Sequence, residues 1–425
     1  MAGLMFISLL VLLFLSVPVA LSLGLASSIA LIGDGTMPLS VVIQRMFAAL
    51  DLFPLMAIPF FILAGALMET GGISRRLVNF ANALVGRMSG GLAVVTVVTA
   101  MFFSAISGSS AATTAAIGSI LIPAMVKKKY DVGFAGATTA VSGELGVIIP
   151  PSIPMIIFGI SAGVSMTDLF IAGFLPGILI GGSLILLVWL LSKKRGYEGE
   201  KNITWAMRVT AFKEAFLALM MPVIILGGIY SGLFTPTEAA VVAVFYAFVV
   251  GVFVYREITW RNLVEIFSKS AITTSIIMII IANAGMFGWI LTREQVPQKV
   301  AAFFTSFSDS PVVFLALINV LLLFVGMFFE TSAAIIILAP LLTPIAITLG
   351  IDPIHFGMIV IVNLAMGMVT PPVGVNLFVA CQVANIKLER LTKALVPFFI
   401  VLVANILIIT YIPAISTWLP ALLKQ

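Results

Sequence analysis

Charged residues are scarce in this sequence of 425 residues. Asp, Glu, Lys and Arg together make up 9% of it, and hydrophobic residues make up 61%. Soluble domains contain roughly 25% charged and 45–50% apolar residues. Too few polar side chains remain to cover a surface in water. The composition therefore excludes an ordinary soluble protein and indicates an integral membrane protein that contacts the lipid bilayer.

Cysteine and histidine occur once each, as Cys381 and His355. A single cysteine excludes an internal disulfide, and this pair alone makes a poor zinc site. The sequence has no Walker A motif, so it does not hydrolyse ATP by that route. Residues 159–163 match the pattern G-x-S-x-G, but in a predicted half-helix rather than between a strand and a helix. We therefore expect neither an enzyme nor an organic cofactor.

Apolar runs with helical length and period fill most of the chain, which favours an all-α polytopic membrane protein over a barrel. Residues 3–33 run on past Pro18 and are too long for a cleavable signal, so we expect a retained first span. Nine spans are predicted in all: 3–33, 52–70, 133–165, 169–191, 214–232, 237–255, 271–292, 355–385 and 394–418.

Basic residues are distributed unevenly between the two sides that these spans define. If the N-terminus is cytoplasmic, all but four of the 22 Lys and Arg lie on the cytoplasmic side. The four on the outer side are Arg45, Arg293, Lys299 and Lys424. This asymmetry follows the positive-inside rule and explains the net charge of +5 without a nucleic-acid partner. It also predicts a periplasmic C-terminus.

The same interruption of an apolar stretch occurs twice, at 146–151 (Gly-Val-Ile-Ile-Pro-Pro) and at 367–372 (Gly-Met-Val-Thr-Pro-Pro). Pro176 and Pro397 match at the same offset. By the predicted spans, the first copy, about 52–191, begins outside and ends inside, and the second, about 271–418, does the opposite. The sequence therefore predicts inverted repeats, a design common among secondary transporters.

Each repeat also contains a pair of apolar segments, 91–107 with 109–125 and 311–329 with 331–349. Their midpoints, 104–110 and 326–332, are polar or rich in glycine where an aqueous loop would carry basic or turn residues. We predict re-entrant hairpins with tips inside the membrane, although two full spans remain an alternative. Segments 72–87 and 295–306 precede the hairpins and are predicted as amphipathic interfacial helices, with plain surface helices as the alternative. Residues 192–213 are predicted as the linker between the halves.

The two Pro-Pro pairs predict breaks in the helices at Ile149 and Thr370. Proline has no N–H, and the residue before it is disfavoured in the helical region, so nearby carbonyl groups lose their helical partners. A dehydrated cation can bind such carbonyls within a membrane, and sodium is the natural candidate. The predicted sodium ligands at the two breaks and tips are Ser104, Ser107, Gly146, Ile149, Gly326, Gly367 and Thr370.

A half-helix begins after each Pro-Pro pair, and its positive dipole end suits an organic carboxylate. The predicted substrate contacts are Ser109, Ser110, Ser152, Thr331, Ser332 and Asn376. Glu330 and Glu144 fall in apolar surroundings and are candidate cation ligands or proton carriers. No Lys or Arg is predicted within a span. We therefore expect helix termini and bound cations to neutralise an anionic substrate.

The sequence resembles the large membrane subunit of tripartite ATP-independent periplasmic (TRAP) transporters over essentially its whole length. The matching motifs are Ser107-Gly108-Ser109-Ser110-Ala111-Ala112, 146–152 and Gly367-x-x-Thr370-Pro371-Pro372. The resemblance implies sodium-driven import of sialic acid or a C4-dicarboxylate across the bacterial inner membrane. It also implies two partners, a separate small four-helix membrane subunit and a periplasmic substrate-binding protein.

The resemblance further implies an elevator mechanism. The scaffold helices and arms would be 1–90 and 192–310, and the mobile transport domain 91–191 and 311–425. Phe328 and Phe329 stand where Ile106 and Ser107 align, so equivalence of the two sodium sites is not implied. A proton-coupled or stand-alone organic-anion transporter that uses Glu330 or Glu144 remains the alternative.

Overall fold

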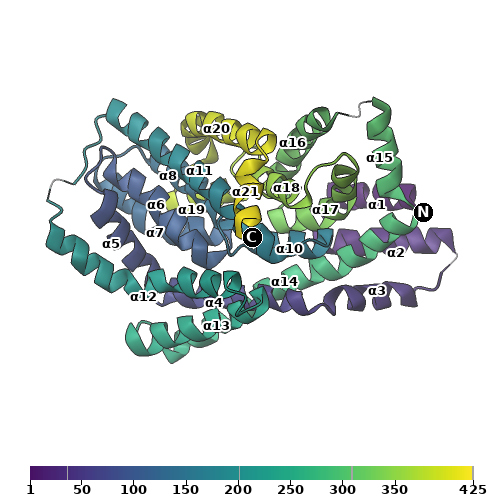
Figure 1. Cartoon of the computed structure of the whole chain (residues 1–425), viewed down its shortest axis with the longest axis horizontal. Helices are drawn as coiled ribbons and strands as arrows, with labels where there is room; N and C mark the ends of the chain where they lie inside the picture. Colours follow the sequence, from purple (N-terminus) through teal and green to yellow (C-terminus); the bar gives the residue numbers. More distant parts are fainter. Residues whose placement is uncertain (36, 201, 308–309, 424–425) are drawn as a thin grey trace.

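The computed structural model describes residues 1–35, 37–200, 202–307 and 310–423, which form helices joined by turns and loops, with no strand among them (Figure 1). The helices up to the middle of the chain are α1 (Ala2–Phe14), α2 (Val19–Asp34), α3 (Ser40–Leu50), η1 (Phe53–Met56), α4 (Ala57–Thr70), α5 (Ile73–Val85), α6 (Gly91–Ser107), α7 (Ser110–Lys127), α8 (Val132–Gly143), α9 (Leu145–Ile148), α10 (Ile153–Ala162) and α11 (Met166–Lys194). Those that follow are α12 (Trp205–Tyr230), α13 (Pro236–Val249), η2 (Val250–Val254), α14 (Trp260–Arg293), α15 (Val296–Phe307), α16 (Pro311–Phe328), α17 (Thr331–Thr348), α18 (Pro353–Gly367), α19 (Val375–Ala384), α20 (Leu388–Tyr411) and α21 (Ala414–Leu423).

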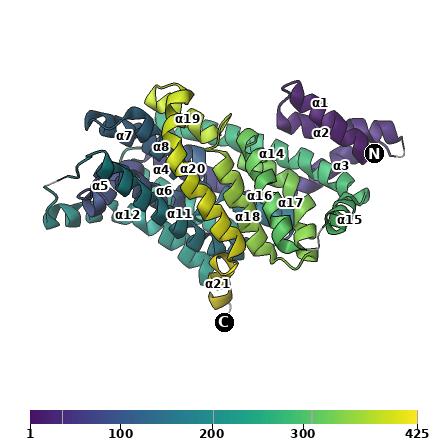
Figure 2. The ribbon, with the colours of Figure 1, turned by 90° about the horizontal axis from the view of Figure 1, so that it is seen from above.

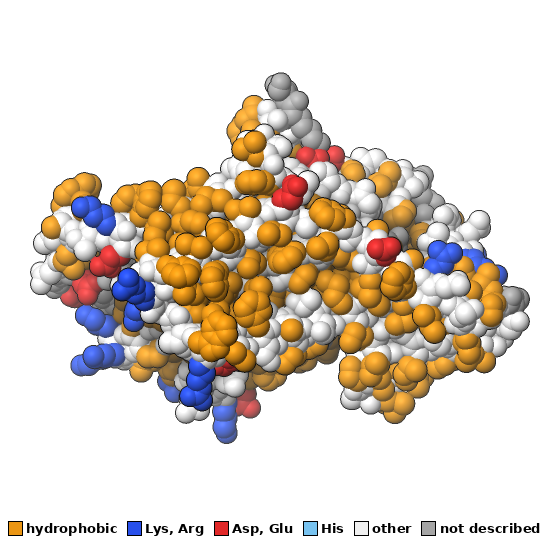
Figure 3. Space-filling view, turned by 90° about the horizontal axis from the view of Figure 1, so that it is seen from below, with side chains coloured by type: hydrophobic (Ala, Val, Ile, Leu, Met, Phe, Trp, Pro, Cys, Tyr) orange, Lys and Arg blue, Asp and Glu red, His pale blue; other side chains and the backbone are white. Residues whose placement is uncertain are grey.

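The structure confirms the predicted class of a multi-pass helical membrane protein. Within the described residues, nine helices are long and apolar enough to cross a bilayer. Large apolar side chains remain exposed on α12, α14, α16 and α20, for example Phe216, Ile276, Phe324 and Ile400. Figure 3 shows hydrophobic side chains spread across one face, with most of the Lys and Arg side chains toward its left edge. A lipid environment accommodates such a surface.

The prediction of one span over residues 3–33 is wrong. The chain breaks at Pro18, and α1 and α2 pack against each other instead of continuing in one direction (Figure 2). Pro18 cannot donate a helical hydrogen bond, and Ser16 adopts a φ of 61°, which turns the chain. Neither helix, at 13 and 16 residues, has the length of a full span.

The packing of α1 against α2 places the N-terminus near the C-terminal end of α14. The Met1 amino group is 3.8 Å from Glu294 Oε2, directly after α14, and Arg293 contacts Met37 just before α3. Both ends of the α1–α2 pair therefore lie at the C-terminal end of α14. The charge distribution predicts that end of α14 to be outside, whereas it was also used to predict a cytoplasmic N-terminus, so the two predictions do not agree. No Lys or Arg precedes Arg45, so no basic residue of α1 or α2 helps to place the N-terminus.

The segments around the middle of the chain are more helical than predicted. The span expected over 271–292 is the C-terminal part of α14, which has 34 residues and begins after its N-cap Thr259. The predicted linker 192–213 lies partly within helices, because α11 continues to Lys194 and α12 begins at Trp205. An ion pair of 2.6 Å between Glu265 and Lys269, one turn apart, stabilises the extra turns of α14.

The two repeats contain matching elements in the same order. The hairpin α6–α7 corresponds to α16–α17, the broken helix α8–α9 with α10 corresponds to α18 with α19, and α11 corresponds to α20. The repeats also exchange half-helices, since α19 packs against α7 and α10 packs against α17 (Figure 1). This arrangement brings both hairpin tips and both helix breaks to the middle of the molecule. Both Pro-Pro bonds are cis.

The segments predicted as amphipathic helices are helical, as α5 and α15. Ile73, Leu77 and Ala81 of α5 are buried, while Arg75 is exposed. α5 lies at one end of the elongated molecule and α15 at the other (Figure 1). Each therefore flanks the repeat whose hairpin it precedes.

Candidate functional site

The first hairpin tip contacts the first helix break. A Cβ atom at Gly146 would lie 2.5 Å from the Ser109 carbonyl oxygen and 2.6 Å from Thr113 Oγ1. The Ile153 N–H donates to the Gly108 carbonyl at 3.3 Å. Only glycine at position 146 permits this approach, because a side chain would collide with the backbone of the tip.

Hydroxyl groups surround this first contact. Ser107 Oγ and Thr113 Oγ1 are 2.8 Å apart, and Thr113 Oγ1 donates to the Ser109 carbonyl at 2.8 Å. Ser104 is fully buried, and its Oγ donates to the Ala100 carbonyl at 2.5 Å. Ile149, at the break, is extended, with φ −81° and ψ 127°. The structure thus brings together Ser107 and Gly146, two of the predicted sodium ligands, and Ser109, a predicted substrate contact.

The second hairpin tip contacts the second break in the same way. A Cβ atom at Gly326 would lie 2.9 Å from Gly367 Cα, and the Gly374 N–H donates to the Met327 carbonyl at 3.2 Å. Thr370 Oγ1 donates to the Met366 carbonyl at 2.8 Å and keeps its oxygen lone pairs. The tip and the break of the second repeat are therefore one packed unit.

Both tips meet at the side chain of Met368. Ser110 Oγ donates to Met368 Sδ at 3.3 Å, and Thr331 Oγ1 donates to the same sulfur at 3.0 Å. Ser110 and Thr331 are the first residues of α7 and α17. Met368 lies at the break, directly after α18, and an apolar side chain in an apolar stretch of sequence gives no signal of such a contact.

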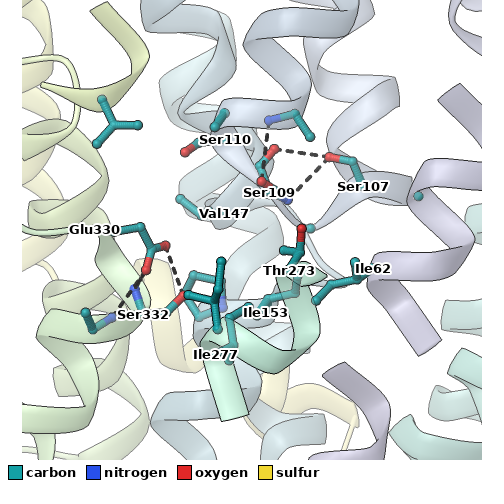
Figure 4. Close-up of a pocket in the computed structure, with 18 of the residues that line it drawn as sticks. Ile62, Ser107, Ser109, Ser110, Val147, Ile153, Thr273, Ile277, Glu330 and Ser332 are labelled. Carbon is teal, nitrogen blue, oxygen red and sulfur yellow. Dashed lines mark hydrogen bonds between the residues drawn. The ribbon is translucent and has the colours of Figure 1, made fainter. Parts of the chain in front are cut away.

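A cavity of about 610 Å³ lies beside the tips. Both tips line one wall, and Figure 4 shows Glu330 and Ser332 on one side of the space and Ser107 and Ser109 on another. Helices α2, α4 and α14 supply the remaining wall, with Thr273 and Ile277 of α14 labelled in the same view. A space of this volume accommodates a small organic molecule.

The predicted substrate contacts divide into two groups. Ser109, Ser110 and Ser332 line the cavity, whereas Ser152, Thr331 and Asn376 do not. Ser152 lies inside the first break and donates to the Val147 carbonyl at 2.6 Å. Asn376 is fully buried, and its side-chain amide has no hydrogen-bond partner among the described residues.

The two predicted carboxylates lie in different surroundings. Glu330 is the N-cap of α17, and its exposed side chain lines the cavity. Glu144, between α8 and α9, is 1% exposed and does not line the cavity. Glu144 Oε2 has no hydrogen-bond partner within the described part of the chain. The two carboxylates were predicted to have the same role, but Glu330 lines the cavity whereas Glu144 lies in the protein interior.

Two charged residues of the cavity wall were missed by the sequence analysis. Glu69 of α4 and Lys269 of α14 both line the cavity. The expectation that no Lys or Arg lies within a span did not anticipate Lys269, which belongs to the candidate spanning helix α14 and lines the cavity. The prediction placed Lys269 in a cytoplasmic loop, because the apolar window began at residue 271. The helical spacing of Glu265, Lys269 and Thr273 was the available signal.

The motif at residues 159–163 has no catalytic geometry. Ser161 lies within α10, followed by the left-handed residue Gly163 that ends the helix. A nucleophile elbow requires a sharp turn between a strand and a helix. The fold and the site thus define a helical membrane transporter.

A family model described as "Tripartite ATP-independent periplasmic transporter, DctM component" matches residues 6–415. The chain belongs to this family. It is accordingly the large permease component of a TRAP transporter, and not an enzyme.

Several proteins with established names are similar along most of the chain. The isethionate TRAP transporter permease protein DctMQ of Oleidesulfovibrio alaskensis is 47% identical over 95% of the chain, which spans 64% of that longer protein. The C4-dicarboxylate TRAP transporter large permease protein DctM of Rhodobacter capsulatus is 39% identical, with 100% of both chains covered. The sialic acid TRAP transporter large permease protein SiaM of Vibrio cholerae is 40% identical over 97% of this chain and 96% of that one.

Among solved structures, the YdaH transporter of Alcanivorax borkumensis has a similar fold. The TM-score is 0.62 at 17% sequence identity, over 90% of this chain and 87% of that one. At this identity the similarity concerns the fold alone.

Proposed function

We propose that this chain imports an organic acid by sodium-coupled secondary transport. The observation that carries the proposal is the contact of each hairpin tip with a helix break, twice, beside one cavity. Backbone that is not helical within a membrane is tolerated where it binds a ligand or lines a watery space. The two packed units supply such backbone next to the space that would hold the substrate.

Sodium would bind at the two contacts between tip and break. At the first, the hydroxyl groups of Ser104 and Ser107 and the backbone at Gly146 and Ile149 are the proposed ligands. At the second, they are the backbone at Gly326 and Gly367 and the hydroxyl of Thr370. Hydroxyl and carbonyl oxygens are suitable ligands for a hard cation.

The cavity would hold the substrate between Ser109 and Ser110 of the first tip and Ser332 of the second. The names of relatives give isethionate, C4-dicarboxylates and sialic acid as transported compounds, all of them organic acids. Three other predicted contacts do not line the cavity and would not touch the substrate: Ser152, Thr331 and Asn376. Lys269 supplies a positive charge to the cavity from the scaffold side.

The transporter would operate in the bacterial inner membrane with a small four-helix membrane subunit and a periplasmic binding protein. The tripartite family and its large-permease relatives support this assembly. We infer that the C-terminus is periplasmic. Because Met1 lies beside Glu294, we place the N-terminus on that same outer side.

An elevator motion would carry the substrate across the membrane. The cavity separates α2, α4 and α14 from both hairpin tips, which is the proposed border between the scaffold (1–90 and 192–310) and the transport domain (91–191 and 311–425). Relative motion of these two parts would expose the cavity to each side in turn.

Reconstituted uptake tests the coupling. The chain, with its small subunit, is placed in liposomes, and binding protein loaded with isethionate, succinate or N-acetylneuraminate is added outside. Uptake of one of these acids that requires an inward sodium gradient supports the proposal. Equal uptake in sodium-free buffer refutes sodium coupling.

Proton coupling is the second candidate, and the isolation of Glu144 favours it. A buried carboxylate without a charged partner can carry a proton, and intramembrane carboxylates often have such roles. Glu144→Gln distinguishes the two ions. Under sodium coupling the variant retains sodium-driven uptake with an unchanged pH profile, whereas a proton carrier would lose its pH dependence. Glu330→Gln applies the same test to the other carboxylate.

A further inference from the structure

The Glu330 carboxylate is fixed by hydrogen bonds and is also accessible from the cavity. Its Oε2 accepts hydrogen bonds from the backbone N–H groups of Ser332 at 2.9 Å and Ala333 at 3.3 Å. Its Oε1 accepts from Ser332 Oγ at 3.0 Å. A carboxylate has about four lone-pair sites, so one acceptor position on Oε1 remains. The side chain is exposed in the cavity wall, where a bound molecule can reach that position (Figure 4).

The first tip has a neutral residue at the matching place. Ser109 is the N-cap of α7, and its Oγ accepts from the Ala112 N–H at 3.4 Å. Glu330 is the N-cap of α17 and lies 221 positions later (330 minus 109), the offset of the two Pro-Pro pairs. With the N-caps matched in this way, Phe328 rather than Phe329 corresponds to Ser107. Serine serves well as an N-cap, so helix capping alone does not require a carboxylate at position 330. The negative charge is an additional property of the second tip.

The other charged side chains around the cavity do not neutralise the Glu330 carboxylate. Glu69 adds a second carboxylate to the wall, and Lys269 is the one basic residue in the described lining. Lys269 Nζ already pairs with Glu265 Oε1 at 2.6 Å. A substrate with one acidic group can bind with that group toward Lys269 and the first tip. A substrate with two acidic groups would bring one of them close to Glu330.

We propose that Glu330 selects, among organic acids, a monoanion that carries a hydroxyl or ammonium group. That group donates a hydrogen bond to Glu330 Oε1, and the carboxylate repels dianions such as C4-dicarboxylates. The inference rests on the proposed function, because it assigns the substrate class of the same cavity. It makes the second tip the specificity element and leaves the acidic end of the substrate to the rest of the cavity.

Binding to the purified complex of this chain and its small subunit tests the proposal without the selectivity of the binding protein. The probes are isethionate, a hydroxylated monoanion; ethanesulfonate, which lacks only the hydroxyl; N-acetylneuraminate, a second hydroxylated monoanion; and succinate, a dianion at neutral pH. The measurement is the shift in thermal unfolding temperature as each probe is titrated. A hydrogen bond to a charged group predicts a half-saturating concentration about tenfold lower for isethionate than for ethanesulfonate. Succinate should bind at least as weakly as ethanesulfonate.

Two variants connect the selectivity to Glu330. Glu330→Ser gives the second tip the N-cap of the first, and Glu330→Gln preserves side-chain length while removing the charge. Both should bring isethionate and ethanesulfonate within about twofold of each other and admit succinate. Glu214→Gln removes an exposed carboxylate of α12 that does not line the cavity, and it should leave the selectivity unchanged.

Several results would overturn the inference. They are succinate binding as tightly as isethionate in the unaltered protein, binding by neither hydroxylated monoanion, or unchanged selectivity in both Glu330 variants. The uptake assay in liposomes tests sodium coupling and is independent of these binding measurements. Sodium-independent uptake would refute the coupling mechanism, while the binding ratios would still decide the role of Glu330.

Discussion

Gly326 and Gly367 lie backbone against backbone, where the second hairpin meets the second broken helix. A Cβ atom at Gly326 would stand 2.9 Å from Gly367 Cα and 2.9 Å from the Leu364 carbonyl oxygen. Cβ atoms in proteins essentially never make contacts that short, so a side chain at this position must separate the two elements.

Gly326→Ala should therefore destabilise the second tip. Overpacking of this kind typically costs about 1–3 kcal/mol, which predicts a lower unfolding temperature and impaired uptake. Gly227→Ala is the matched control, because no atom lies within 4 Å of a Cβ built there on α12. Alanine at 227 should be neutral or stabilising by up to about 1 kcal/mol. Equal unfolding temperatures for the two variants would contradict the packing argument.

Thr370→Ala should raise the sodium concentration for half-maximal uptake. Loss of one oxygen ligand worth about 1.4 kcal/mol corresponds to roughly a tenfold increase. Thr370→Ser is the control, since it retains the hydroxyl that donates to the Met366 carbonyl. Sodium titrations of uptake provide the measurement. If the alanine and serine variants need the same sodium concentration, Thr370 is not a ligand.

Ser107→Ala tests the first site in the same assay. Its hydroxyl lies 2.8 Å from Thr113 Oγ1 and 3.2 Å from the Ser109 carbonyl oxygen. Its removal should raise the sodium requirement by a similar factor. Ser119→Ala removes the hydroxyl of an exposed residue on α7, the other helix of the same hairpin, and should have no effect. A normal sodium dependence in the Ser107 variant would exclude this residue from the ion site.

Asp131→Asn should lower stability slightly, and only above acidic pH. Burial by itself raises the pKa of Asp131, but the Phe134 N–H, Arg390 and Arg195 together lower it below its ordinary value of 3.8. A group with a lowered pKa stabilises the folded state above its unfolded pKa, and this contribution is lost as the pH falls through the folded pKa. Because the side chain is 42% exposed, the expected effect is below about 1 kcal/mol.

The measurement for Asp131 is thermal unfolding between pH 7 and pH 3. The difference between the unaltered protein and Asp131→Asn should shrink below about pH 4, and it should also shrink in high salt. Asparagine preserves the N-cap of α8, so the comparison isolates the ion pair with Arg390 at 3.1 Å. A difference that persists unchanged at pH 3 would exclude this linkage.

Glu257→Gln should loosen the attachment of α5. Glu257 Oε1 accepts from Arg75 at 2.8 Å and from Arg76 at 2.7 Å, and the Arg76 guanidinium lies 3.7 Å from the centre of the Tyr255 ring. Since Arg76 and Glu257 are only partly exposed, we expect a loss of about 1 kcal/mol in stability. The same change at Glu265, in a fully exposed pair, should cost less. Equal losses would indicate that α5 is attached by other contacts.

Local chemistry made part of the fold predictable. At each Pro-Pro pair, 150–151 and 371–372, two successive residues lack a backbone N–H, and the breaks occur where the sequence predicts them. The polar midpoints of the hairpins, at Gly108 and Glu330, likewise mark turns between helices. These features depend on a few adjacent residues, so their positions follow from the chain alone.

Other features depend on neighbours far away in the chain. The fold-back at Pro18 was missed, because the apolar pattern of residues 3–33 is the same for one long helix and for two packed ones. Lys269 was placed in a loop, because only the packing of α14 against the hairpin tips shows that it lines a cavity. Asn376 and Ser152 have the right chemistry for a substrate contact but lie behind the wall.

Composition and proline chemistry act locally, and they were sufficient to predict a helical membrane protein with two copies of a broken helix and a polar hairpin. The packing of α19 against α7 and of α10 against α17, the meeting of both tips at Met368, and the position of Glu330 but not Glu144 in the cavity wall are known only from the folded structure. The physical reason is that a contact between distant segments depends on which surfaces pack together, and an apolar surface in an apolar sequence can pack in several ways.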